Sequence, residues 1–235
     1  MDGYLFAVVL AALALTRLPS AIRGRNPLVM ISAAAIVIAF TLITPFIYVR
    51  VSSLLPVPNM VDLIAKLSLF TGLILAGSQV SQAYNAPRIR RLIAGQPGQI
   101  VFFIVFSVEV VIFALVHSTH LVADLAGNLE NPLVRLYSTL ATSYAGFVAA
   151  ILFPLVGRRL RSQERSTRAT SAFLVIGFGL TIVRAALGLV SLLIPAAYYV
   201  GQVVSELAAS FVALGLATSF FARILRQRQA RRQCN

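Results

Sequence analysis

Cysteine, tryptophan and charged residues are scarce in this sequence. Cys234 is the single cysteine among 235 residues, tryptophan is absent, and only 11% of the residues are charged. One cysteine cannot form an internal disulfide framework, and we expect it to stay reduced in a cytoplasmic tail. The sequence also lacks the H-E-x-x-H, G-x-S-x-G and P-loop signatures of common enzyme classes. These absences argue against a disulfide-stabilised domain and give no reason to predict an enzyme.

Long apolar runs make up most of the chain. Apolar residues account for 59% of the sequence, and the mean hydropathy is +0.88. A helix that crosses a bilayer needs about 20 mostly apolar residues, and runs near this length recur along the chain. This composition excludes a soluble domain. It indicates an all-α, polytopic protein of the cell membrane, with membrane lipids as its surroundings.

Seven stretches are predicted to cross the membrane and to form a seven-helix bundle. They cover residues 3–21, 28–49, 59–81, 100–117, 134–156, 171–194 and 198–222. The first begins "MDGYLFAVVLAALALT", which lacks the basic start of a signal peptide, so we expect it to be retained. Residues 1–222 are then one transmembrane domain, and residues 223–235 are a basic tail.

The distribution of charge decides what the net charge of +13 means. Sixteen of the twenty basic residues lie in every second connection or in the tail, whereas the other connections hold only Arg50 and Arg135 near their edges. This alternation is the positive-inside signal, which marks the basic side as cytoplasmic. We therefore predict an N-terminus outside, a C-terminus in the cytoplasm and no nucleic acid as a partner.

Two segments of the chain align with each other at a spacing of 139 residues. Residues 32–67 match residues 171–206 without a gap, with Pro56 opposite Pro195. Apolar segments also align by chance, so two interpretations remain. The match is either a parallel repeat of three-helix units, as in some transporters, or a coincidence of composition.

The segment "FTLITPFIYVRVSSLLPVPNMVDLIAKL" contains a T-P-x-x-Y-x-R pattern followed by V-P-N, and "APRIRRLI" forms a basic connection. With these features, and with Arg184 and Glu206, the chain resembles a family of uncharacterised actinobacterial seven-span integral membrane proteins classed as transporters. The resemblance covers about residues 28–222 and implies a topology but no defined activity. Members usually continue into a cytoplasmic C-terminal domain, so this chain is expected to be a short or truncated member.

Five charged residues interrupt the predicted spans. They are Asp62, Lys66, Glu109, Arg184 and Glu206. A charge at the bilayer centre costs at least ~2.5–3.5 kcal/mol on insertion scales, so we expect all five to face the interior of the bundle. Together they predict a polar binding cavity in the outer half of the membrane. The alternative is a set of interhelical ion pairs that only fix the bundle.

Counting residues from the outer turns predicts two contacts between these charges. Lys66 lies one helical turn after Asp62 and at a depth similar to that of Glu109, so Lys66 and Glu109 are expected to pair. Arg184 and Glu206 each lie eleven residues from Pro195, which predicts a second pair. A guanidinium has five donors, so Arg184 would keep donors for an anionic ligand or for Glu109; the alternative is a purely structural, hydrated pair.

The remaining polar residues have less specific interpretations. Hydroxyl residues within 138–144 are expected to pack helices against one another. Four tyrosines near the outer boundary are expected to anchor the membrane interface, namely Tyr48, Tyr137, Tyr198 and Tyr199.

Both histidines lie in the outer loop "HSTHLVADLAGNLENP". On a helical extension, His117, His120 and Asp124 share a face, and these residue types can bind zinc. Three loosely spaced ligands without a fourth are a weak pattern, and no second cluster supports it. We therefore predict no metal site and no cofactor.

Three functions fit these features. The leading hypothesis is a transporter or binding protein for a small polar or charged molecule, which would enter the buried charge cluster from outside. The second is a receptor-like sensor that signals to a cytoplasmic protein partner or to a missing C-terminal domain. The third is an accessory subunit whose buried charges are structural.

Overall fold

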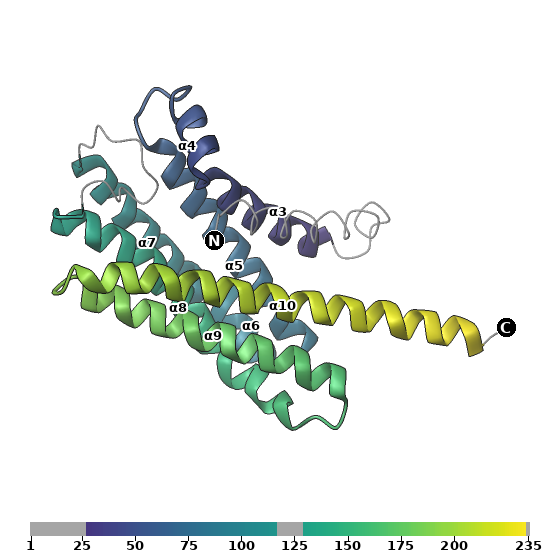
Figure 1. Ribbon diagram of the computed structural model, residues 1–235. Coiled ribbons are helices and arrows are strands. Elements are labelled where there is room, and N and C mark those ends of the chain that lie inside the picture. Colours follow the sequence, from purple (N-terminus) through teal and green to yellow (C-terminus); the bar gives the residue numbers. More distant parts are fainter. Residues whose placement is uncertain (1–26, 117–128, 234–235) are drawn as a thin grey trace.

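The computed structural model describes residues 27–116 and 129–233, and within these ranges it contains helices and turns but no strand. The helices are α3 (Pro27–Leu42), α4 (Pro45–Ser52), α5 (Met60–Ala83), α6 (Pro87–Ala94), α7 (Gln96–Leu115), α8 (Pro132–Gly157), the 3-10 turn η2 (Arg158–Arg161), α9 (Arg165–Ser191) and α10 (Ala196–Gln233). Figure 1 shows their arrangement.

Five of the described helical segments are long and apolar enough to cross a membrane, and a sixth is counted if the bent pair α3–α4 is one span. This agrees with the predicted all-α membrane protein. The first of the seven predicted spans, residues 3–21, lies outside the described residues. The number of seven spans and the orientation of the termini therefore stay predictions.

The predicted span 28–49 is broken. α3 and α4 meet at an angle of 85°, because Pro45 has no backbone N–H and disfavours helical geometry at Thr44. Thr44 is extended, with φ −67° and ψ 125°, and its hydroxyl donates to the Phe40 carbonyl oxygen at 3.0 Å. Pro45 then begins α4 at a position that suits its fixed φ.

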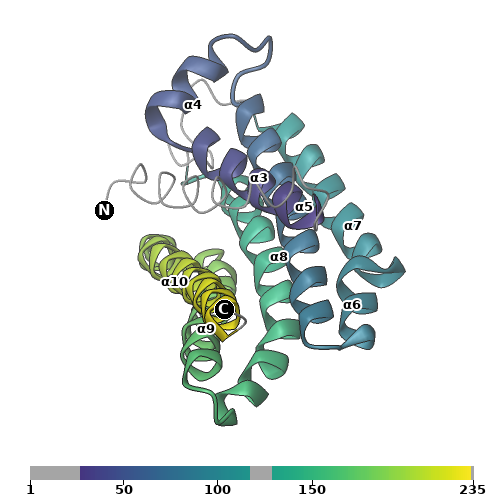
Figure 2. The same cartoon turned by 90° about the vertical axis from the view of Figure 1, so that its right-hand side faces the viewer.

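The helices form two pairs joined by α8. α3 packs on α5, and α9 packs on α10, while α8 contacts both α5 and α9. Figure 2 shows α8 between the α3–α5 pair and the α9–α10 pair. α6 connects α5 to α7 and packs against both. One apolar core, which includes Phe70 and Tyr144, lies where α5, α7 and α8 meet.

Glycines allow the paired helices to approach closely. A Cβ at Gly72 of α5 would lie 2.6 Å from Cγ1 of Ile36 on α3. A Cβ at Gly177 of α9 would lie 2.7 Å from a methyl carbon of Val212 on α10. Small residues at helix contacts are the usual means of packing inside a membrane, where lipid removes the hydrophobic drive for association.

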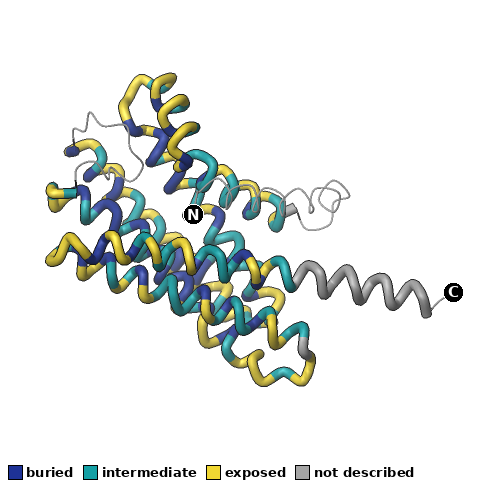
Figure 3. The backbone as a smooth tube through the Cα atoms, in the orientation of Figure 1, coloured by how far each residue is buried: buried dark blue, intermediate teal, exposed yellow. Residues whose placement is uncertain are grey.

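Two of the basic connections lie at the same end of the bundle. The Arg159 guanidinium of η2 lies over the ring of Tyr84, 5.5 Å from its centroid, and α6 with its three exposed arginines packs against α8. The turns at the other end expose apolar side chains, with Leu54 and Leu193 82% and 86% accessible. Figure 3 shows the exposed turns against the buried interior. The two ends therefore differ in charge as the alternation of basic connections predicts.

The two segments that align at a spacing of 139 residues fold differently. Residues 32–67 contain the break at Thr44, whereas residues 171–206 begin inside the unbroken helix α9. Pro45, which starts α4, is opposite Arg184 in the middle of α9. The structure thus favours coincidence of composition over a repeat.

Candidate functional site

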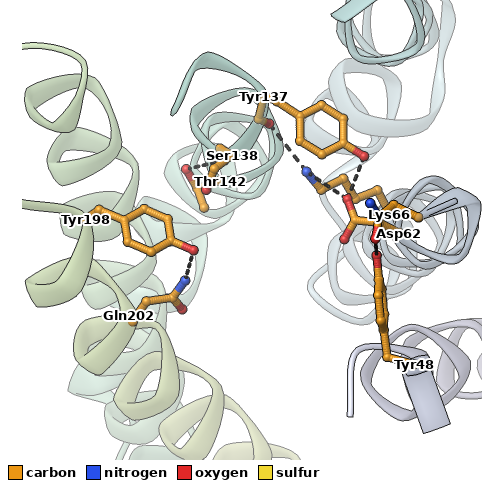
Figure 4. A network of polar contacts seen from close by, with 9 residues as sticks. Tyr48, Asp62, Lys66, Tyr137, Ser138, Thr142, Tyr198 and Gln202 are labelled. Atoms are coloured by element: carbon orange, nitrogen blue, oxygen red, sulfur yellow. Dashed lines mark hydrogen bonds and ion pairs between the residues drawn. The ribbon is translucent and has the colours of Figure 1, made fainter. Parts of the chain in front are cut away.

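A buried polar network links the first turn of α5 to α8. The Tyr137 hydroxyl donates to Oδ2 of Asp62 at 2.6 Å, and Lys66 Nζ lies 3.5 Å from the same oxygen. Lys66 Nζ also lies 3.2 Å from the centroid of the Tyr137 ring and donates to the Tyr137 carbonyl oxygen at 3.5 Å. All three side chains are buried (Figure 4). The ammonium is thus held by a carboxylate and an aromatic face together, which offsets its desolvation.

The same region fixes α4 to the start of α5. The Tyr48 hydroxyl donates to Oδ1 of Asn59 at 2.8 Å, and the Asn59 backbone N–H donates to Oγ of Ser52 at 3.2 Å. Asn59 has a φ of 61°, in the left-handed region that asparagine tolerates better than most residues. Asn59 therefore turns the chain from α4 into α5 while its side chain binds Tyr48.

Glu109 of α7 is completely buried, as expected for a carboxylate in a membrane-spanning helix. It lies one turn before Ile112, a residue whose apolar cluster includes Tyr137 of α8. Glu109 is therefore inside the bundle near the network of α5 and α8. Its contact with Lys66 stays a prediction.

Arg184 of α9 is 4% exposed and lies against α10. A Cβ at Gly201 would lie 2.9 Å from Nη1 and 3.0 Å from Cζ of this guanidinium, so the end of the Arg184 side chain occupies space that the absent Cβ leaves open. Cζ of Arg184 is 5.8 Å from the centroid of the Tyr198 ring, whose hydroxyl accepts a hydrogen bond from Nε2 of Gln202 at 2.7 Å. Figure 4 shows the pair of Tyr198 and Gln202.

Glu206 does not have the predicted position. Four of the five charges in the predicted spans are buried, but Glu206 is exposed. It follows Gly201 by five residues, which rotates it about 140° around α10 at 3.6 residues per turn. The prediction that Glu206 is buried against Arg184 is wrong, because equal depth in two helices does not put two residues on facing sides.

A cleft of about 380 Å³ lies between the two helix pairs. α3 and α5 form one wall, α9 and α10 form the other, and α8 contributes residues between them. Among the described residues that line this cleft, Arg184 alone is charged. Five uncharged polar residues also line it, namely Ser32, Gln79, Thr142, Thr181 and Ser205. The other lining side chains are apolar and many are alanines.

Of the five predicted site residues, Arg184 lines this cleft. Asp62 and Lys66 belong to the network between α5 and α8, Glu109 is buried in α7, and Glu206 is exposed on α10. The structure therefore separates an ion-pair network from a cleft with a single guanidinium. The sequence predicted one cavity for all five.

The sequence interpretation missed the roles of three tyrosines. Tyr48, Tyr137 and Tyr198 are 1%, 0% and 4% exposed and have side-chain hydrogen-bond partners, of which the Gln202 partner of Tyr198 is half-buried. Tyr199, in contrast, is 65% exposed as an interface residue would be. A signal was present, because Tyr198 and Tyr199 are adjacent and must point in different directions on a helix. Thr142, assigned to packing, lines the cleft and donates to the Thr139 carbonyl oxygen at 3.0 Å.

The weak metal pattern of His117, His120 and Asp124 lies outside the described residues. Within residues 27–116 and 129–233, no group of three histidine, cysteine or acidic side chains is placed to hold a metal ion.

Comparison of the chain with protein families, curated proteins and solved structures finds no match. The resemblance to actinobacterial seven-span transporters stays a prediction. Function is therefore inferred from the cleft and from the Arg184 guanidinium in its wall.

Proposed function

We propose that this integral membrane protein binds and carries a small anionic molecule in the cleft between the two helix pairs, with Arg184 as the counter-charge. The observation that carries the proposal is a buried guanidinium in the wall of an otherwise uncharged cleft. The volume of about 380 Å³ falls in the range of ~300–1,000 Å³ that is usual for small-molecule pockets.

The chemistry of arginine favours an anion. A guanidinium stays charged when buried and presents five donors in a planar fork, which fits a carboxylate or phosphate with two parallel hydrogen bonds. Such contacts are strengthened where water is excluded. Thr142 and Ser205 line the same cleft and supply hydroxyl groups for further hydrogen bonds.

The polar network of Asp62, Lys66 and Tyr137 has a different part in this proposal. It joins α5 to α8, so it fixes one wall of the cleft to the helix that separates the two pairs. The α9–α10 pair meets this unit through α8. A change in the angle between the two units would open or close the cleft, which is the motion that a carrier needs.

The test measures binding of radiolabelled carboxylates by the purified protein in lipid nanodiscs, with the matching alcohols as uncharged probes. We expect at least one carboxylate to bind more tightly than its alcohol. Arg184→Gln should weaken that binding by about tenfold or more, since each tenfold corresponds to ~1.4 kcal/mol. Arg184→Lys should retain part of it because the charge remains. Arg50→Gln is the control, because Arg50 is exposed on α4 and stacks on Phe46 at 4.5 Å.

Equal binding of carboxylate and alcohol, or equal effects of the Arg184 and Arg50 substitutions, would contradict the proposal. Transport is tested separately by uptake of the bound carboxylate into proteoliposomes. Uptake that Arg184→Gln abolishes would support a carrier over a binding protein.

A sensor is the second proposed function, favoured by the length of α10. This helix has 38 residues, about 57 Å at 1.5 Å per residue, against about 30 Å for the hydrocarbon core. Ser205, Ala208 and Val212 of α10 line the cleft, and the same helix continues to Gln233. A ligand that moves this wall would move the distal end of α10. Binding without uptake, together with a ligand-dependent change in a spin label on Gln229, would favour the sensor.

A further inference from the structure

We propose that the ligand of the cleft is a single-chain anionic lipid, a long-chain carboxylate whose head binds Arg184 and whose chain lies between α3 and α10. This inference rests on the proposed function, since it needs the cleft to bind an anion. It adds the class of the ligand, the direction in which it lies and the route by which it enters.

The charged position and the apolar walls are at different places along the cleft. On α10 the lining runs from Ser205 to Leu216, eleven residues or about 16 Å. Arg184 reaches Gly201, beyond the Ser205 end of this stretch. The lining of α3 runs from Val29 to Phe40. The cleft is therefore elongated along the helices and carries its guanidinium at the end nearer the α9–α10 turn.

A compact water-soluble anion would use only that end. It would leave the apolar lining on α3, α5 and α10 without contacts, and a dry void forfeits the dispersion energy of its walls. A chain attached to the anion fills this part of the cleft, where most lining side chains are apolar and Ser32 and Gln79 are polar exceptions. An acidic head with an apolar chain thus complements both parts of the lining, the guanidinium and the apolar walls.

The surroundings of the cleft offer a lateral route. Leu216, which lines the cleft, is 43% exposed, so the cleft reaches the side of the bundle. α3 and α10 flank it there, and both expose further apolar residues, including Ile31 at 47% and Leu214 at 49%. These surfaces face hydrocarbon in a membrane-spanning protein. A lipid can therefore enter sideways from the bilayer.

The N-terminal segment is the competing occupant from within the chain. Residues 3–21 are apolar and rich in alanine, but they contain no acidic residue, and Asp2 precedes them. A helix from this segment would bring no carboxylate to the depth of Arg184. Charge complementarity therefore favours the anionic lipid.

The experiment uses the full chain in nanodiscs and hexadecanoate with a diazirine near the end of its chain as a photoprobe. We expect cross-links on α3 and α10 at the Val29 and Leu216 end, and competition by hexadecanoate at least tenfold stronger than by hexadecanol. Ala209→Leu narrows the cleft without changing charge and should reduce labelling about tenfold, as should Arg184→Gln. Ala150→Leu is the matched control, because Ala150 is exposed on α8 and does not line the cleft.

Three results would overturn the lipid inference. The first is equal competition by hexadecanol and hexadecanoate, and the second is equal labelling of the Ala209→Leu and Ala150→Leu variants. The third is rapid disulfide cross-linking of an Ala12→Cys/Ala209→Cys pair in a Cys234→Ser background, because it would put the N-terminal segment in the cleft. If butyrate binds in an Arg184-dependent way and hexadecanoate binds no better, the lipid inference fails and the proposed function stands. If no carboxylate depends on Arg184, both fail.

Discussion

At the residue scale, the structure assigns the buried polar side chains to two different tasks. Asp62, Lys66 and Tyr137 satisfy one another and join two helices, whereas Arg184 lies at a cleft wall beside a glycine. Charged side chains that are similarly costly to bury in a membrane therefore hold two helices together in one place and line a candidate binding site in the other.

The first prediction concerns the hydroxyl of Tyr137. Tyr137→Phe keeps the ring over Lys66 but removes the donor to the buried Asp62 carboxylate, so the free energy of unfolding should fall by roughly 1–3 kcal/mol. Denaturant unfolding in detergent measures this decrease in the free energy of unfolding. Tyr199→Phe is the control, because Tyr199 is 65% exposed. Equal stability of the two variants would count against the network.

The second prediction concerns the space beside Arg184. Gly201→Ala puts a methyl group 2.9 Å from Nη1, so the guanidinium must move and binding of the carboxylate should weaken about tenfold, equivalent to ~1.4 kcal/mol. Stability should change less, because the far end of a flexible side chain can shift. Gly157→Ala is the control, since a Cβ there has no neighbour within 4 Å among the described residues. An unchanged affinity of Gly201→Ala for the carboxylate would show that Arg184 does not bind the ligand.

The sequence predicted which residues are charged inside the membrane and, for four of them, that they are buried. It failed for Glu206, because counting from a turn gives depth while the facing side depends on rotation about the helix. Nothing in the sequence indicated a role for Gly201, because glycine has no side chain. Only the packing of α9 on α10 reveals that its missing Cβ makes room for Arg184.

At the scale of elements, the broken pair α3–α4 differs most from the prediction. The apolar run is long enough to span a membrane, so a single unbroken span was predicted there. The physical reason for the break is nevertheless in the sequence, because Pro45 disfavours helical geometry at Thr44. The long helices α5, α8, α9 and α10 were predictable, because uninterrupted apolar length is a strong signal. The pairing of the helices was not, since lipid-facing and protein-facing sides are equally apolar.

The third prediction tests the contact of α5 with α7. If Lys66 and Glu109 pair, Lys66→Met and Glu109→Gln should each reduce the free energy of unfolding by roughly 3–5 kcal/mol, because a buried charge loses a partner. The double variant should lose less than the sum of the two single losses, although Asp62 still lacks Lys66 in it, and a double-mutant cycle by denaturant unfolding measures the coupling. Additive losses would show that the two residues act independently. The expected loss in the free energy of unfolding applies to a buried ion pair, and both side chains are buried.

At the scale of the whole molecule, the two ends of the bundle differ in chemistry. One end gathers the arginines of α6 and η2, and the other exposes Leu54 and Leu193 in its turns. The distribution of basic residues in the sequence predicted this polarity. It could not predict the cleft, because a cleft depends on how two helix pairs are spaced around a third helix.

The fourth prediction fixes the orientation. In a Cys234→Ser background, Leu193→Cys should react with an impermeant thiol reagent on intact cells, whereas Gln163→Cys should react only after permeabilisation. The reason is the positive-inside rule applied to the arginine-rich end. Both positions are exposed, so accessibility within the protein does not limit either reaction. The opposite pattern would invert the molecule and place the guanidinium of the cleft in the inner half of the bilayer.

The break at Thr44 also affects how the protein meets the bilayer. Because α4 turns away from α3 by 85°, the two helices cannot run side by side across the membrane. The exposed side chains of α4 include Phe46, Val49 and Arg50, which are an aromatic, an aliphatic and a basic group. This mixture suits the boundary between acyl chains and headgroups, where apolar groups enter hydrocarbon and a cation stays in the polar layer. α4 would therefore lie along the membrane surface at that end of the bundle, and the headgroup charge of the surrounding lipids would act on Arg50.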